Sequence, residues 1–308
     1  MCLFKPSSVI MFRIMTTIKP IAMIGVLSVF VVLMWGATAW LRLLSMNVPP
    51  LELTAIALCA AAVTSWLLRG RSNFARGAIG HHPWYVWLTV VVGLVGSSGF
   101  FYTALNYAPA AQVVVITYSW PLLFAIASDV YSGRRPSPWT LVGLLIGFAG
   151  IYVMQGAAHG PSAHAWLGYA CSLASGLCWV GYSLLFQVYK RPVAAAYPVF
   201  FIVGAGTALL LQMTVGGLVW PGSSVAWLAS IVLGVGPFGL GFIAWGYIVQ
   251  HGNPNVVPVL PYGVPVVAAI TLIMAGHSQP SLSLFVGCAL VIAACVVVTC
   301  VHKPRAAV

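Results

Sequence analysis

Two stretches of the sequence place an indole and several hydroxyl groups at the spacing of one helix face. The first contains Ser28, Val31, Trp35, Thr38 and Arg42. The equivalent positions 144 residues later are Ser172, Ser175, Trp179, Tyr182 and Phe186. A hydroxyl or indole N–H in apolar surroundings needs a hydrogen-bond partner, so each face is expected to lie against protein or a cavity. Ordinary helix packing, with serines bonded to their own backbone, is the alternative.

Tyrosine and proline recur together in the same register. Tyr118 stands three residues before Pro121, and Tyr262 stands three residues before Pro265, again 144 residues later. The prolines of both stretches are Pro121, Pro258, Pro261 and Pro265. Proline removes a backbone donor and bends a helix, so we expect these residues to act as gating hinges. The alternative is that the tyrosines anchor the bends and contact no ligand.

Titratable residues are few and scattered. The two carboxylates, Glu52 and Asp129, lie toward the ends of apolar runs, and the histidines fall at run ends or between runs. The seven cysteines lack Cys-x-x-Cys spacing and lie mostly inside apolar runs. We therefore expect no metal, no cofactor, no disulfide and no catalytic constellation.

The composition excludes a water-soluble surface. The chain is 61% hydrophobic and 5% charged, with a mean hydropathy of +1.03, whereas soluble domains carry about 25% charged residues. Long unbroken apolar runs predict an all-α integral membrane protein rather than a barrel. The ten expected spans are 21–44, 51–68, 84–107, 110–131, 139–155, 166–187, 197–219, 226–249, 256–275 and 282–301.

The basic residues indicate how these spans cross the membrane. Twelve of the thirteen Lys and Arg residues fall at the two ends of the chain or in alternate joints, and only Arg42 falls on the opposite side. By the positive-inside rule, both termini are expected in the cytoplasm. The net charge of +11 thus reports membrane topology, and no nucleic acid partner is expected.

The shared offset of 144 residues predicts an internal repeat. It aligns Ser28 with Ser172, Trp35 with Trp179, and Gly143 with Gly287. We expect a first five-helix repeat over 21–155 and a second over 164–301, with segments 1–20 and 302–308 in the cytoplasm. Because five is odd, the second repeat enters the membrane in the opposite sense. Inverted repeats are typical of secondary transporters with a site near the midplane.

Over nearly its whole length, the chain resembles the EamA-type, ten-helix branch of the drug/metabolite transporter superfamily. The resemblance rests on 102-YTALNYAPAA-111, on Pro121, on Asp129 with Gly133, and on glycines 143, 147 and 150. The family usually has Glu where Asp129 stands. Within it, the chain is most similar to the YddG-type aromatic amino acid exporters. The resemblance implies a multi-pass exporter of the cytoplasmic (inner) membrane with a central cavity.

On this basis we expect alternating-access export of small amphiphilic metabolites, most of all aromatic amino acids, by a monomer or homodimer surrounded by membrane lipid. The expected substrate-binding residues are Trp35, Thr38, Tyr102, Tyr118, Trp179, Tyr182, Ser183 and Tyr262. Their ring faces suit an ammonium group, in contacts worth ~0.5–2 kcal/mol. No arginine is evident in the membrane core for the carboxylate, so a helix N-terminus or water is expected to serve it.

Proton coupling commonly needs an ionisable residue inside the membrane, and neither carboxylate is placed there. We therefore expect facilitated transport without ion coupling, with proton coupling through Asp129 as the alternative. Other neutral amino acids, nucleosides and drug-like compounds are alternative substrates. An integral membrane enzyme acting on lipid is a remote alternative, because such enzymes place a constellation of reactive side chains near one interface.

Overall fold

The computed structural model describes residues 20–69, 82–155, 164–189, 196–277 and 279–301, and all regular structure in these ranges is helical. The first part of the chain forms α2 (Pro20–Leu44), α3 (Pro50–Arg69), α4 (Trp84–Val91), η2 (Val92–Gly96), α5 (Ser97–Leu105), α6 (Ala110–Thr117), α7 (Trp120–Tyr131) and α8 (Pro138–Gln155). The second part forms α9 (Ala165–Val188), α10 (Tyr197–Val215), α11 (Ser224–Leu233), η3 (Gly234–Leu240), α12 (Gly241–His251), η4 (Val257–Tyr262), α13 (Gly263–Met274) and α14 (Leu282–Val301).

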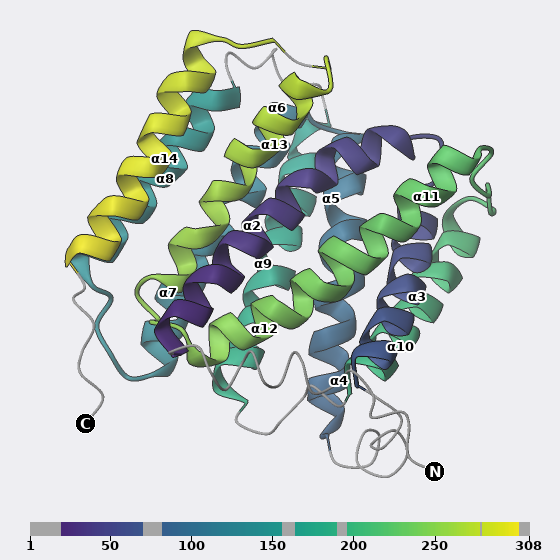
Figure 1. The fold of residues 1–308 in the computed structure, drawn as a ribbon, viewed down its shortest axis with the longest axis horizontal. Coiled ribbons are helices and arrows are strands. Elements are labelled where there is room, and N and C mark those ends of the chain that lie inside the picture. The colour runs from purple at the N-terminus through teal and green to yellow at the C-terminus, as the bar shows by residue number, and fades with distance from the viewer. Residues whose placement is uncertain (1–19, 70–81, 156–163, 190–195, 278, 302–308) are drawn as a thin grey trace, which may run out of the picture.

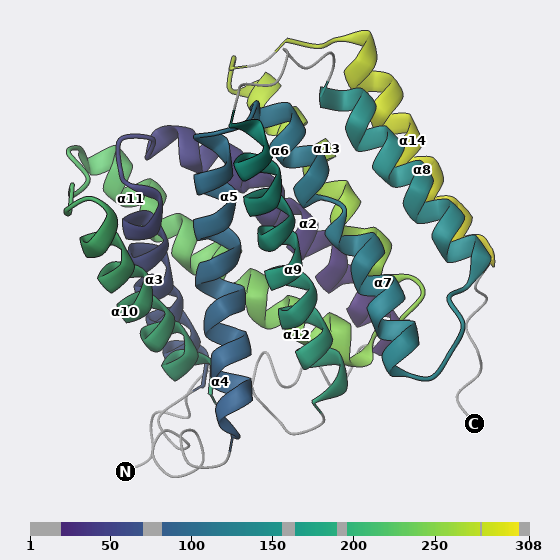
Figure 2. The ribbon, with the colours of Figure 1, turned by 180° about the vertical axis from the view of Figure 1, so that it is seen from behind.

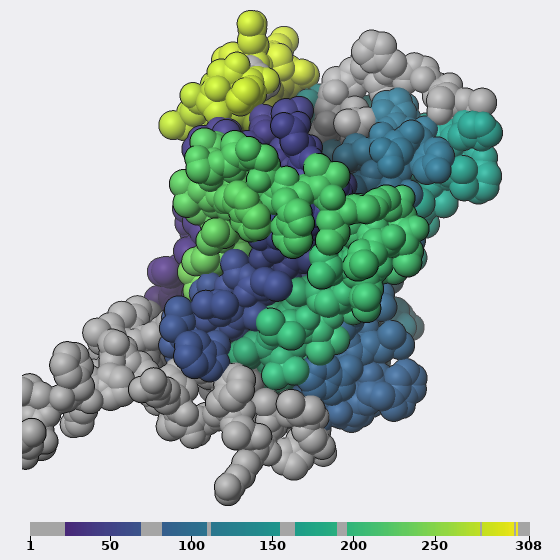
Figure 3. All heavy atoms as spheres, turned by 90° about the vertical axis from the view of Figure 1, so that its right-hand side faces the viewer, coloured from purple at the N-terminus to yellow at the C-terminus, as the bar shows by residue number. Residues whose placement is uncertain are grey.

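Eight helical segments of the described chain are long and apolar enough to cross a membrane. The other two expected spans form the apolar helices α8 and α14, whose described apolar stretches are shorter, Pro138–Met154 and Leu282–Val298. Helices α3, α10 and α11 lie side by side on the face shown in Figure 3. On these helices Leu67, Leu210 and Leu228 are 63–66% exposed, as expected of side chains that face lipid. The chain is a multi-pass membrane protein.

Two of the expected spans are broken rather than smoothly bent. The span over 110–131 divides into α6 and α7, because Ser119 N donates to Ile116 O at 3.1 Å in a tight three-residue step just before Pro121. The span over 256–275 begins as the 3₁₀ helix η4, which contains Pro258 and Pro261, and continues as α13. The two breaks fall at Tyr118 and Tyr262, which are equivalent at the offset of 144 residues.

The third and eighth spans each contain a π-helical segment, η2 and η3. A π turn widens the helix and leaves its carbonyls less regularly bonded, and such turns are frequent at functional sites. Residues 92–96 of η2 correspond to 236–240 at the repeat offset, and these lie within η3. Pro237 explains part of the widening in η3, because it cannot donate to the preceding turn.

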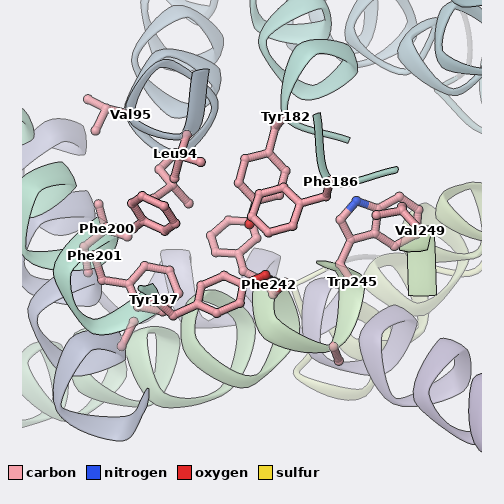
Figure 4. Packing of buried hydrophobic residues seen from close by; sticks show 14 of the residues in the cluster. Leu94, Val95, Tyr182, Phe186, Tyr197, Phe200, Phe201, Phe242, Trp245 and Val249 are labelled. Atoms are coloured by element: carbon pink, nitrogen blue, oxygen red, sulfur yellow. Dashed lines mark hydrogen bonds between the residues drawn. The ribbon is translucent and has the colours of Figure 1, made fainter. Parts of the chain in front are cut away.

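The helices pack in pairs that join the two halves of the chain. Helix α8 packs along α14 at one edge of the molecule, and α3 packs along α10 at the other (Figures 1 and 2). Between these edges, α2 contacts α12 and α13 from the second half, whereas α9 contacts α5, α6 and α7 from the first half. The interior between the edges is rich in aromatic side chains, including Tyr182, Phe186, Tyr197, Phe200 and Phe242 (Figure 4).

Candidate functional site

A cavity of about 240 Å³ lies among α2, α5, the α6–α7 break, α9, the η3–α12 junction and the η4–α13 junction. This volume is close to the lower end of the roughly 300–1,000 Å³ seen for small-molecule sites. Its wall consists of aromatic rings, hydroxyls, prolines and one valine, and carries no charged side chain. The lining residues are Trp35, Thr38, Ser97, Ser98, Phe101, Tyr102, Thr117, Tyr118, Trp120, Ser175, Trp179, Pro237, Phe238, Phe242, Pro261 and Val264.

A cluster of four tryptophans closes one end of this cavity. The ring centroids of Trp35 and Trp179 are 5.2 Å apart, and Trp120 stacks on Trp179 at 5.9 Å with an angle of 26°. Trp245 lies 5.5 Å from Trp35 and 6.0 Å from Trp120. Beyond the cluster, side chains that include Val31 fill the space around Trp35 and Trp245 and leave no room for water. The cavity is therefore open on one side of the cluster and blocked on the other.

Hydrogen bonds hold the polar groups of the wall in place. Trp35 Nε1 donates to Pro237 O at 3.1 Å, which ties α2 to the π-helical segment η3. Ser175 Oγ donates to Ser97 O at 2.7 Å and joins α9 to α5. The Thr38 hydroxyl donates to the Trp35 carbonyl one turn earlier. These bonds satisfy buried donors and fix the indole of Trp35 edge-on to η3.

The structure brings five of the eight expected substrate-binding residues to the cavity wall and leaves three away from it. Trp35, Thr38, Tyr102, Tyr118 and Trp179 line the cavity. Tyr182, Ser183 and Tyr262 do not line it, and each is fully buried.

Each of the three is packed against other side chains of the bundle. The Tyr182 ring packs 4.6 Å from that of Phe186 (Figure 4). Ser183 Oγ accepts a hydrogen bond from Trp245 Nε1 at 3.1 Å. Tyr262 belongs to a separate apolar cluster with Leu144. In this conformation, none of the three reaches the space that a ligand would occupy.

The four expected hinge prolines also occupy different settings. Pro261 lines the cavity, whereas Pro258 is buried within η4. Pro121 and Pro265 are buried in the first turns of α7 and α13, where a missing N–H is tolerated. All four adjoin the helix breaks, but their role as hinges stays a prediction.

Sequence reasoning missed part of the wall. Trp120, Phe101, Phe238 and Phe242 line the cavity, and Trp245 completes the cluster at its closed end. The available signal was depth, because Trp120 lies in the middle of its apolar run, whereas most other tryptophans stand near the ends of theirs. A tryptophan away from the interfacial belt needs a partner for its N–H and is a candidate for a cavity wall.

The two carboxylates lie outside the cavity. Asp129 forms an ion pair with Arg134, with Nη2 3.0 Å from Oδ1. Glu52 is fully buried, and its Oε2 accepts a hydrogen bond from Val219 N at 2.7 Å. Within the described ranges there is no cluster of three or more residues suited to hold a metal ion.

Comparison with known proteins gives a consistent result. Residues 20–155 match the EamA-like transporter family. Over 274 residues the chain is 31% identical to the aromatic amino acid exporter YddG of Ancylobacter novellus, covering 87% of this chain and 94% of the relative. It is 23% identical to the exporter of the same name in Salmonella typhimurium, covering 61% and 68% of the two chains.

A solved crystal structure superposes with a TM-score of 0.81 at 30% identity and covers 90% of this chain and 96% of that one. The fold and the sequence likeness thus extend over nearly the same length of chain. The chain belongs to the EamA-like transporter family.

Proposed function

We propose that the protein exports aromatic amino acids across the cytoplasmic (inner) membrane through the central cavity. The observation that carries the proposal is the composition of the wall, in which indole and phenyl rings alternate with hydroxyls and no side chain is charged. Ring faces suit both an aromatic side chain and an ammonium group. The 31% identity to an aromatic amino acid exporter supports the same substrate class.

The mechanism we propose is alternating access by two inverted five-helix repeats, over 21–155 and 164–301, within ten spanning helices. Three features support the repeats: the equivalent breaks at Tyr118 and Tyr262, the overlapping π-helical segments, and the packing of α8 along α14. A further feature is the cavity wall, to which several residues equivalent at the offset of 144 contribute from both halves of the chain. These pairs are Trp35 with Trp179, Ser98 with Phe242, Thr117 with Pro261, and Trp120 with Val264.

The conformation described is outward-facing if both termini are cytoplasmic. In that orientation α2 and α5 run outward, so Thr38 and Tyr102 lie on the outer side of Trp35. The packed region around Val31 and Ile248 then forms the closed inner side. The basic residues that favour this orientation fall mostly outside the described residues.

Transport without ion coupling is the mode that we propose. Asp129 is 6% exposed and already neutralised by Arg134, and no carboxylate lines the cavity. A group that carries protons during transport needs access to the pathway and must change its charge during the cycle. Neither carboxylate of this chain meets both conditions in the described conformation.

Flux of radiolabelled phenylalanine and tryptophan into proteoliposomes, with and without an imposed pH gradient, tests this proposal. Saturable flux that ignores the gradient is expected, and Trp179→Ala should reduce it about tenfold or more, because the variant loses stacking with Trp120 and contact with the substrate. Trp166→Ala, at a 63% exposed position, is the matched control and should leave flux unchanged.

Other results would redirect the proposal. A competition panel of neutral amino acids, nucleosides and drug-like amphiphiles separates the alternative substrates. Absence of any aromatic amino acid flux would remove the substrate assignment, and flux that follows the proton gradient would remove the uncoupled mechanism. The lining residues supply no acid–base or nucleophilic pair for an enzyme.

A further inference from the structure

Arg42 occupies an unusual position for a charged residue of this chain. It stands in the last turn of α2, one helical turn beyond Thr38 of the cavity wall. Its guanidinium carbon lies over the ring of Tyr102, 5.5 Å from the ring centroid, and Tyr102 also lines the cavity. Arg42 is therefore a cation held against a residue of the wall of a cavity that has no charged lining side chain.

The hydrogen bonds of Arg42 leave one edge of the guanidinium available. Nη1 donates to Ser45 O at 2.7 Å and to Val48 O at 3.2 Å, which uses both of its hydrogens and fixes the group beyond the end of α2. Within the described residues, Nε and Nη2 make no hydrogen bond. These two nitrogens form the edge that binds a carboxylate in two parallel hydrogen bonds.

Arg42 also has no anionic partner in the described part of the chain. Of the two acidic residues of the whole sequence, Asp129 pairs with Arg134, and Glu52 makes no ion pair with a described residue. A half-buried cation without a counter-ion favours the approach of an anion. The uncharged wall, with an arginine next to Tyr102, is thus complementary to a molecule with an aromatic body and one carboxylate.

We propose that Arg42 binds the carboxylate of the substrate through its Nε–Nη2 edge while the aromatic side chain of the substrate occupies the cavity. The inference rests on the proposed function and sharpens it, because it makes an α-carboxylate a required element of the substrate. Tyr102 holds the guanidinium in place by the cation–π contact. The competing explanation is that Arg42 only caps the C-terminal end of α2.

Uptake of radiolabelled phenylalanine into proteoliposomes, with unlabelled phenylalanine and phenylalanine amide as competitors, separates these explanations. The amide keeps the ring and the amino group but lacks the carboxylate. In the wild type, the amide should compete about tenfold or more weakly than phenylalanine, as expected for loss of a charge-assisted hydrogen bond. In Arg42→Gln, the two competitors should become nearly equal, because the phenylalanine KM rises and the inhibition constant of the amide does not.

Two variants complete the experiment. Arg42→Lys keeps the charge without the bidentate edge, so its preference for phenylalanine over the amide should be intermediate. This variant replaces Arg42→Gln in the test if Arg42→Gln gives too little uptake to measure. Arg135→Gln removes an exposed arginine away from the cavity and should retain the wild-type preference. A preference unchanged by both Arg42 substitutions, or equal potency of both competitors in the wild type, overturns the inference alone. Absence of phenylalanine uptake by the wild type overturns the proposed function and the inference with it.

Discussion

Positions that are equivalent in the two halves of the chain lie in opposite environments on the two sides of the tryptophan cluster. Thr38 and Tyr118 line the cavity, whereas their equivalents, Tyr182 and Tyr262, are fully buried. The relation also runs the other way, because Ser175 lines the cavity whereas its equivalent Val31 belongs to the packed region beyond Trp35. Positions that are related by the offset of 144 residues thus lie in two different packings.

This difference shows how one sequence pattern serves both an open and a closed side. If the halves exchange conformations, the buried set becomes the wall of an inner cavity and the present wall becomes packed, as expected for inverted repeats. The central pair, Trp35 and Trp179, lines the cavity from both halves and would stay at the site in either state. Tyr182 and Tyr262 would then contact substrate only in the inward-facing conformation.

The largest expected difference is in the rate at which cysteines introduced at two positions of α2 react with a thiol reagent. In a cysteine-free background, a charged thiol reagent should modify Thr38→Cys roughly tenfold or more faster than Val31→Cys, because only position 38 faces the cavity. The two positions lie on the same helix on opposite sides of Trp35, so each serves as the control for the other. Equal rates in purified protein would contradict the open and closed sides described above.

A substitution on α8 tests how tightly the closed packing holds Tyr262. A Cβ added at Gly147 would overlap the Tyr262 ring, so Gly147→Ala should lower the free energy of unfolding by about 1–3 kcal/mol. Gly206→Ala is the matched control, because nothing lies within 4 Å of the added Cβ. Melting of the purified variants in detergent measures the effect. An unchanged transition for Gly147→Ala would mean that the Tyr262 ring moves freely.

Removing the hydroxyl of Tyr262 should change stability in the opposite direction. It is buried and has no hydrogen-bond partner within the described residues, and an unsatisfied buried hydroxyl costs about 1–3 kcal/mol. Tyr262→Phe should therefore raise the melting temperature, whereas Tyr118→Phe at the cavity wall should leave it nearly unchanged. If Tyr262→Phe is less stable than the wild type, the hydroxyl has a partner and the closed side is polar there.

The smallest effect on stability is expected from a substitution of Asp129, which is not one of the paired positions compared above. The side chain of its partner Arg134 is 48% exposed, so solvent screens the ion pair and Asp129→Asn should cost at most about 1 kcal/mol of stability. Phenylalanine flux should remain independent of an imposed pH gradient in the wild type and in Asp129→Asn. A gradient-driven component that disappears in Asp129→Asn would make this residue the proton carrier.

The helices follow closely from the sequence, whereas their internal irregularities do not. Apolar runs bounded by Pro, Gly, Asn or charge predict most ends within two or three residues; the span expected to reach Val219 ends at Val215, where Gly216 and Gly217 follow. The π-helical segments were not foreseen. In a π turn the backbone hydrogen bond spans five residues instead of four, and over so short a segment this change cannot be detected in the pattern of hydrophobic residues. The proline-rich runs were expected as bends, but they form breaks.

The candidate site was foreseen in part, for a physical reason. Treating the halves as equal placed Tyr182 and Tyr262 beside Thr38 and Tyr118, but a single conformation opens to one side only. If the halves exchange conformations, the relative free energies of the two packings decide which of these residues line the cavity at one moment. Arg42 was set aside as an outlier of the charge pattern, although its contact with Tyr102 places it at the cavity.

The four clustered tryptophans give the protein an optical property of its own. Indole rings with centroids 5.2–6.0 Å apart couple their electronic transitions, and the sign and strength of that coupling depend on the angles between the rings. The near-ultraviolet circular dichroism should therefore carry a strong contribution from this cluster, beside that of the stacked pair Trp220 and Trp227, whose centroids are 6.1 Å apart. A motion that opened the closed side would change the angles between these rings, so the native chromophores would record that motion without an attached label.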